Sequence, residues 1–418
     1  MSRIGRVAKV SVDMRLARDG GPRARSRPER PMFPGGMELG EEEVEAAARV
    51  IRSHNVFRYY GVGEGPHEVA DFEREFAAYM GAKHALCLNA GSSALICGLI
   101  GAGVRPGDEV IVPAYTWNAT PNAVIASGGV PVLAEVDDSL TLDPEDVARR
   151  ITPRTKAILP VHMRGAPADI GALTALAAEH GLALIEDVCQ AAGASYRGAR
   201  LGSFGDAGAF SLQFNKIITT GEGGVMITDR DDLHELAIDV HDCAGSVRRG
   251  AGLPRFAGWN FRASEIQGAI ARVQLARLDG LLERMRAQQA RLAERVSGLP
   301  GLTLRRPNDE DGDAGICLIA FAERPELAAE AVEALRVEGV EAMRVYDPEF
   351  VDLHVYPYWQ PVLEAIAREG RPQPDCPRTL ALLERTIHID LSPLNDEQDL
   401  DEIGLAFEKV AHGVLEPA

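Results

Sequence analysis

The amino-acid sequence predicts an α/β fold in two domains: a large domain around a mostly parallel sheet flanked by helices, and a smaller α+β domain at the C-terminus. Two observations support this prediction. Short apolar runs alternate with segments of helical period between residues 84 and 228, and strands that are apolar throughout are typical of sheets that helices cover on both faces. A chain of 418 residues also exceeds the usual length of one domain.

The chain begins with a segment that has no sustained period. It is rich in Arg, Gly and Pro, as in the run from Arg23 to Arg30. Because such a composition offers little apolar surface to bury, residues 1–35 are expected to form a flexible arm. The large domain is expected over residues 36–297, and it opens with an amphipathic helix near residues 40–52 whose first turn is acidic, as the helix dipole favours.

The expected strands of the large domain are short and apolar, and helical segments such as residues 93–103 and 170–180 separate most of them. In sheets of this kind, ligands bind beyond the carboxyl ends of the strands. The expected strands cover residues 84–89, 109–113, 130–135, 157–161, 182–186, 208–212 and 225–228.

A long amphipathic helix, expected over residues 264–296, ends at a glycine-flanked break at residues 298–301. Glycine is a strong helix terminator, so the break marks the expected domain boundary. Residues 298–418 then form the expected small domain. Its expected strands are residues 302–305, 316–321 and 341–345, and its expected helices are residues 325–338 and 396–414.

Composition excludes several classes of function. A formal net charge of −18 argues against a nucleic-acid-binding surface and against attraction to anionic membranes. The six cysteines form no Cys-x-x-Cys pair, which argues against a zinc site or a disulfide framework and fits reduced thiols. No apolar run has the length of a membrane span or of a signal core. A cytoplasmic location and no bound metal are therefore expected.

One lysine, Lys216, occupies a distinctive position. It follows the expected strand 208–212 and precedes a glycine-rich turn, residues 221–224, that leads into the next strand. Burial at such a place lowers the pKa of a lysine and makes its amine a better nucleophile. The alternative is an ordinary surface lysine beside a hairpin. Which of these two interpretations holds depends on the other residues expected near Lys216.

Three other segments place polar or aromatic groups where expected strands end. Asp187 and Trp117 each follow a strand, and Ser92 and Ser93 lie at the start of a helix, where backbone N–H groups and hydroxyls can hold a phosphate. Each segment has a plain structural alternative, which is helix capping for Asp187 and the serines and packing for Trp117. Together with Lys216, these groups match the needs of a pyridoxal 5′-phosphate site.

The sequence resembles the DegT/DnrJ/EryC1/StrS family of pyridoxal-phosphate-dependent aminotransferases, which aminate keto sugars and cyclitols. The similarity extends from about Phe33 to the C-terminus. It implies the fold of the fold-type I transferases, which resemble aspartate aminotransferase. The most specific matching pieces are Glu186-Asp187-x-x-Gln190-Ala, Ser211-x-Gln213-x-x-Lys216-x-x-Thr219-x-Gly221-Glu-Gly-Gly224 and Gly258-x-Asn260-x-Arg262-x-Ser264-Glu265.

The resemblance implies a role for each matching residue. Lys216 would hold the cofactor as a Schiff base and move the proton during the reaction, and Asp187 would keep the ring nitrogen protonated. Gln190 would lie near the ring hydroxyl, and Trp117 would lie against the ring face. The expected phosphate ligands are Ser92, Ser93 and Ser211.

The resemblance also implies a homodimer whose active sites are shared between subunits. Asn260 and Arg262 resemble residues that reach a neighbouring subunit's site, Asn260 toward the phosphate and Arg262 toward a substrate carboxylate, which suits an arginine fork. His354 and Tyr356 are expected to approach the acceptor from the small domain.

The implied activity is transfer of an amino group from glutamate or glutamine to a cyclic ketone. The ketone would be a keto sugar, which can be nucleotide-linked, or a cyclitol ketone, in amino-sugar, aminocyclitol or antibiotic biosynthesis. Two alternatives stay open. Related pyridoxal-phosphate-dependent sugar dehydratases carry His in place of the lysine, so Lys216 argues against a dehydratase. The complete set of lysine, aspartate and phosphate ligands argues against a non-catalytic regulator on the same fold.

Overall fold

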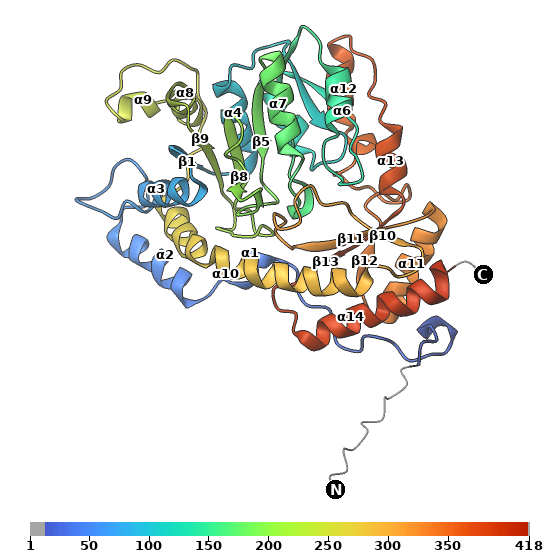
Figure 1. Cartoon of the computed structure of the whole chain (residues 1–418). Coiled ribbons are helices and arrows are strands. Elements are labelled where there is room, and N and C mark those ends of the chain that lie inside the picture. The colour runs from blue at the N-terminus through green and yellow to red at the C-terminus, as the bar shows by residue number, and fades with distance from the viewer. Residues whose placement is uncertain (1–12, 417–418) are drawn as a thin grey trace.

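The computed structural model describes residues 13–416, and its larger part is built on a seven-stranded sheet (Figure 1). The strands are β1 (His84–Leu88), β2 (Glu109–Pro113), β3 (Val130–Ala134), β4 (Thr155–Ile158), β5 (Ala183–Asp187), β8 (Ala207–Ser211) and β9 (Gly224–Thr228). Their order is β1-β9-β8-β5-β4-β2-β3. Only β9 runs antiparallel to its neighbours, while the pairs from β8 to β3 are parallel. The prediction of a mostly parallel sheet is confirmed.

Helices cover both faces of this sheet. Helices α3 (Glu68–Met80) and α10 (Glu265–Val296) pack on one face, and α4 (Gly91–Gly101) and α8 (Asp231–His241) pack on the other. Successive residues of a strand point to opposite faces, so Leu184 belongs to the first core and its neighbour Ile185 to the second. This double burial explains why the strands are apolar throughout.

The remaining helices of this part connect the strands or lie at its edges. They are α1 (Pro34–Met37), α2 (Glu41–Ser53), α5 (Ala119–Ala126), α6 (Pro144–Arg150), α7 (Ile170–His180) and α9 (Gly245–Arg248). Helix α10 starts at a capping box in which the Ser264 hydroxyl accepts from the N–H of Gln267. In Figure 1 it runs in yellow below the large sheet and continues to the second sheet.

The C-terminal part contains a four-stranded antiparallel sheet in the order β10-β11-β13-β12. The central strand β13 was not among the strands expected from the sequence. Its residues Thr386 and His388 alternate with apolar ones, so it does not form an apolar run, although both polar side chains are fully buried. The elements are β10 (Leu302–Leu304), β11 (Cys317–Ala322), α11 (Pro325–Glu338), β12 (Ala342–Met343), α12 (Gln360–Arg368), α13 (Pro377–Leu383), β13 (Thr386–Asp390) and α14 (Glu397–Val410).

Residues 13–35 do not form the flexible arm expected from the sequence. They pack beside α11 and α14, where the blue segment lies next to the red helix in Figure 1. The Arg25 side chain is fully buried and its Nη2 donates to Asp399 Oδ1 at 3.2 Å. The Glu338 carboxylate accepts two backbone N–H groups of the segment at 2.7 and 2.8 Å. These partners are more than 300 residues away, so composition could not reveal them. Residues 1–12 lie outside the described residues.

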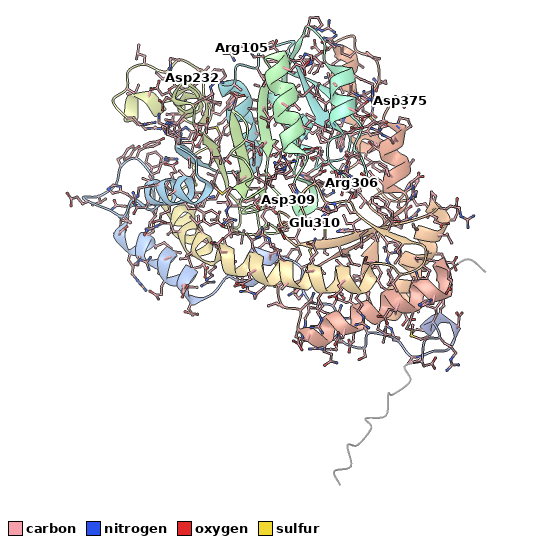
Figure 2. All side chains as sticks on the ribbon, in the orientation of Figure 1. Arg105, Asp232, Arg306, Asp309, Glu310 and Asp375 are labelled. Carbon is pink, nitrogen blue, oxygen red and sulfur yellow. The ribbon has the colours of Figure 1, made fainter. Side chains whose placement is uncertain are left out.

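Charged side chains lie around the periphery of the fold. Figure 2 shows Arg105, Asp232 and Asp375 at the outer edge of the large-sheet layer, and all three are exposed. Between residues 13 and 416, no helix combines the length and the apolar character needed to cross a membrane.

Candidate active site

A cavity of about 300 Å³ lies at the carboxyl ends of the parallel strands of the large sheet. Its walls include Asp187 at the end of β5, Ser211 at the end of β8 and Thr116 just beyond β2. This is the edge at which parallel α/β sheets bind ligands. Seven residues expected from the sequence line the cavity, namely Lys216, Asp187, Gln190, Ser92, Trp117, Ser211 and His354.

Lys216 lies on a turn in the connection from β8 to β9. Its backbone N–H donates to Gln213 O at 2.9 Å, and its carbonyl accepts from Gly35 N at 2.9 Å. Burial lowers the pKa of the Lys216 amine, although the nearby charge of Asp187 acts in the opposite direction. A larger fraction of the amine is therefore neutral near pH 7, as a nucleophilic lysine requires.

Asp187 is buried and held by two hydrogen bonds. Its Oδ2 accepts from Thr120 Oγ1 at 2.8 Å, and its Oδ1 accepts from Cys189 N at 3.0 Å. The Thr120 hydroxyl also meets Thr116 Oγ1 at 2.8 Å. The carboxylate is thus fixed on the wall of the cavity. Thr120 was not among the expected site residues, although its hydroxyl lies three residues after Trp117 and near a strand end, which is a signal that the sequence does contain.

Glu186 turns away from the cavity. Neighbouring strand residues face opposite sides of a sheet, and the Glu186 carboxylate accepts from the backbone N–H groups of Gly202, Phe204 and Gly205 at 2.7–2.9 Å. Its Oε2 also lies 3.1 Å from His162 Nε2. These contacts occupy the Glu186 carboxylate completely, so Asp187 is the acid of this pair that faces a ligand.

The first turn of α4 forms an anion seat. Its N-cap residue, Ala90, supplies no side-chain cap, so the first N–H groups of the helix are free to bind an anion. A Cβ on Gly91 would lie 2.8 Å from Ser211 Cβ, and one on Gly224 would lie 2.3 Å from the Ala90 carbonyl carbon. Only glycine therefore lets β8, β9 and α4 meet here. Ser92 and Ser211, the other expected phosphate ligands, line the cavity beside this turn.

Ser93, expected as a third phosphate ligand, does not line the cavity. Its hydroxyl is buried and donates to Asn89 Oδ1 at 2.7 Å. Successive helix residues point in directions about 100° apart, so Ser92 and Ser93 cannot both face the seat. In this structure the Ser93 hydroxyl is therefore engaged by Asn89, while its backbone N–H lies in the first turn of α4, and its role as a phosphate ligand stays a prediction.

The aromatic wall consists of Trp117 and His354. Trp117 is 43% exposed, and its ring centroid lies 4.9 Å from that of His354. His354 Nδ1 lies 2.7 Å from Asp352 Oδ1. Burial lowers the pKa of His354 even though Asp352 acts to raise it. Gln190 also lines the cavity, and its Oε1 accepts from the N–H of Arg164 at 3.1 Å.

Besides Ser93, three expected residues lie outside this cavity. Arg262 Nη1 donates to Asp242 Oδ1 at 2.8 Å, and the carbonyl of Asn260 accepts from Asn89 Nδ2 at 3.4 Å. Within one chain, this segment therefore lies beside the end of β1 rather than in the site. Tyr356 is buried, and its hydroxyl accepts from the N–H of Cys376 at 3.3 Å. Its expected contact with the acceptor stays a prediction.

The residues around the cavity fit pyridoxal 5′-phosphate. The anion seat suits its phosphate, Asp187 suits its ring nitrogen, and Lys216 offers the amine that forms a Schiff base. When bound, the cofactor supplies an electron sink for the reacting carbon. The chain itself holds the carboxylate in place through Thr120, and Lys216 can carry the proton.

Comparison with known proteins agrees with this geometry. The sequence profile of the DegT/DnrJ/EryC1/StrS aminotransferase family matches residues 38–408. The dTDP-3-amino-3,4,6-trideoxy-alpha-D-glucose transaminase of Streptomyces venezuelae is 36% identical over 359 residues, which cover 85% of this chain and 88% of that protein. The 3-amino-5-hydroxybenzoate synthase of Amycolatopsis mediterranei (strain S699) is 36% identical over 315 residues, or 75% of this chain and 80% of that one.

A solved structure with the same fold is the crystal structure of 3-amino-5-hydroxybenzoic acid (AHBA) synthase. It is similar with a TM-score of 0.77 at 30% identity, over 93% of this chain and 99% of that chain. The family match covers most of the sequence, and the cavity carries the groups that its cofactor requires. The chain therefore belongs to the DegT/DnrJ/EryC1/StrS family and is a pyridoxal-phosphate-dependent aminotransferase.

Proposed function

We propose that this aminotransferase moves an amino group from glutamate or glutamine to a cyclic ketone. The acceptor is a keto sugar, which can be nucleotide-linked, or a cyclitol ketone, and the product enters amino-sugar, aminocyclitol or antibiotic biosynthesis. The observation that carries the proposal is Lys216, whose amine shares one cavity with Asp187 and the α4 anion seat. The relatives named above, one acting on a dTDP-sugar and one making an aminobenzoate, support a ring as acceptor.

The dehydratase alternative is less compatible with the cavity. A lysine at position 216 both anchors the cofactor and returns to act as an acid or base, whereas the related dehydratases place His there. The non-catalytic alternative does not explain a buried lysine with a lowered pKa beside a fixed carboxylate. Perturbed ionisable groups that meet in a cavity are typical of catalytic sites.

Amine transfer can be followed in two separate half-reactions. Adding L-glutamate or L-glutamine to the cofactor-loaded protein should replace the visible absorbance of the lysine-bound cofactor with that of the pyridoxamine form. A panel of keto sugars, nucleotide-linked keto sugars and cyclitol ketones should then restore the visible band with at least one member. Loss of a hydroxyl from the ketone without a new amine would support the dehydratase reading instead.

We also propose that the protein is a homodimer in which Asn260 and Arg262 complete the partner's site. Both residues lie outside the cavity of their own chain. Exposed apolar side chains gather on segments close to them, and such surfaces are typical of subunit contacts. These side chains are Val44, Ile51, Val56, Tyr60, Val62, Val247, Leu253 and Trp259.

Mixed dimers provide the test of shared sites. Lys216→Ala and Arg262→Ala homodimers should each be nearly inactive. In a mixed dimer of the two, one site collects both defects and the other keeps an intact Lys216 and Arg262. Doubly tagged mixed dimers should therefore recover about half of the wild-type activity, provided that the two sites act independently.

The matched control is a mixed dimer of Lys216→Ala with Asp187→Asn. Both of these residues line the cavity of one chain, so each site of this dimer carries one defect and activity should stay low. If the Lys216→Ala and Arg262→Ala mixture stayed equally inactive while remaining folded and dimeric, Arg262 would have to act within its own subunit.

A further inference from the structure

A second cavity, of about 110 Å³, adjoins the first at Lys216. Lys216, Gln190, Asn215 and His354 line both cavities. The second cavity is also lined by Arg164 and by Ile316 and Asp390 of the small domain, and nothing derived above assigns it a function. Because its volume is smaller, this cavity is better suited to a charged group at the end of a short carbon chain than to a ring.

Arg164 is held in an unusual backbone conformation at the end of this cavity. Its φ of 52° and ψ of 42° are left-handed, a conformation that is strained for a residue other than glycine. Neighbouring groups enforce it, since its N–H donates to Gln190 Oε1 at 3.1 Å and its carbonyl accepts from Cys317 Sγ at 3.4 Å. The fold therefore fixes the arginine to a residue of the cofactor cavity and to a strand of the small domain.

The guanidinium of Arg164 is poorly paired for a buried charge. Its side chain is 16% exposed, and its ion pair with Asp390 is long, with 3.7 Å between Nη1 and Oδ1. Among the described residues, its Nε is buried without a hydrogen-bond partner. Asp390 also interacts with His388, whose Nε2 lies 3.2 Å from Oδ1. A buried charge is costly unless it is paired, and an anion in the cavity would complete the pairing of this guanidinium.

Arg164 is the charged group of this lining that suits an anion. Among the described residues that line the cavity, the ionisable side chains are Arg164, Lys216, His354 and Asp390, and burial lowers the pKa of Lys216 and the pKa of His354, which favours their neutral forms. The lasting positive charge of the cavity is therefore that of Arg164. Arginine presents its N–H groups in a fixed planar fork that matches both oxygens of a carboxylate.

We propose that Arg164 binds a carboxylate of the substrate in the second cavity while the reacting carbon lies next to Lys216. This inference rests on the proposed amine transfer, because it places the carboxylate on the amino donor or on the acceptor ketone. In either case, Arg164 selects for a carboxylate from within the same chain.

Binding to the cofactor-loaded protein tests this directly, without any reaction. Glutarate, measured by calorimetry and by its effect on the cofactor's absorbance, should bind Arg164→Gln about tenfold to a hundredfold more weakly than wild type, as expected for losing a charge-assisted hydrogen-bonded pair. Asp390→Asn should bind glutarate more tightly, because it removes the competing carboxylate. Arg306→Gln, a change of the same type at an exposed arginine (Figure 2), should bind glutarate as wild type does.

Two further measurements identify the source of the carboxylate. If Arg164→Gln raises the half-saturating concentration of both L-glutamate and L-glutamine in the first half-reaction, the carboxylate bound is the one next to the donor amine. If Arg164→Gln raises the half-saturating concentration of L-glutamate alone, the carboxylate bound is the side-chain carboxylate of glutamate, which glutamine lacks. If neither is affected, the pyridoxamine form of Arg164→Gln should lose the wild-type preference for 3-oxocyclohexane-1-carboxylate over its carboxamide.

Unchanged affinity of folded, cofactor-loaded Arg164→Gln for both glutarate and 3-oxocyclohexane-1-carboxylate, within about twofold, would overturn the inference. This result is distinct from failure of the proposed function. Calorimetry detects carboxylate binding even in a protein that transfers no amine, and an active aminotransferase could still bind its carboxylate elsewhere.

Discussion

Lys216→Ala protein is expected to bind pyridoxal phosphate without forming the visible-absorbing, borohydride-reducible species of the wild type. The amine of Lys216 lies in the cavity with a pKa lowered by burial, and alanine removes both the covalent anchor and the proton carrier. Amine transfer should fall by at least about 10⁴-fold, as is usual when a covalent catalyst is deleted. Absorbance before and after borohydride, together with single-turnover kinetics, provides the measurement.

Lys83→Ala is the matched control for this substitution. Lys83 is exposed, pairs with Asp231 at 2.7 Å and lies outside the cavity, so this variant should keep the visible band and full activity. If the cofactor stayed covalently attached to Lys216→Ala after borohydride treatment, another lysine would have to anchor it, because reduction fixes a Schiff base to the protein but does not fix a free aldehyde.

Asp187→Asn is expected to lower the rate of amine transfer by about 10² to 10³-fold, a loss typical of removing one preorganised electrostatic group. Asparagine has the shape of aspartate, but it carries no charge to stabilise a protonated ring nitrogen as electrons move into the ring. The Thr120 hydroxyl, 2.8 Å from Oδ2, can still hold the side chain. The kcat of each half-reaction should be measured together with the fraction of protein that carries the cofactor. A lower kcat at full occupancy then indicates slower chemistry, whereas lower occupancy indicates weaker cofactor binding.

Glu186→Gln provides the contrast from the neighbouring position. Because the Glu186 carboxylate accepts three backbone N–H groups and faces away from the cavity, this change should lower the free energy of unfolding by about 1–3 kcal/mol. The rate per loaded site should stay close to that of the wild type. The assignment of Asp187 would fail if Asp187→Asn turned over normally while Glu186→Gln lost its rate at full occupancy.

The sequence by itself determined the strands of the large sheet and the position of Lys216 between two of them. These features are local: an apolar run predicts a buried strand, and a residue at its end lies near the edge where ligands bind. Asp187, Ser211 and Ser92 follow the same rule, and the structure places all three in the cavity with Lys216.

Which of two neighbouring residues faces the cavity could be assigned only from the tertiary structure, because it depends on contacts between residues far apart in the chain. Glu186 and Asp187 are adjacent acidic residues that the sequence does not distinguish. In the structure, the Glu186 carboxylate accepts from N–H groups of the 202–205 loop, whereas the Asp187 carboxylate accepts from the Thr120 hydroxyl and faces the cavity. Ser92 and Ser93 are separated in the same way by the direction each takes in α4.

The packing of residues 13–35, the burial of β13 and the second cavity also emerged only from the fold. Arg25 belongs to a segment whose composition suggests disorder, yet its charge is matched by Asp399 on α14. Arg164 carries no motif that the sequence analysis singled out. Its significance arises because a left-handed turn brings its guanidinium to Asp390 and the Lys216 cavity, and neither sequence period nor spacing encodes such a meeting of distant charges.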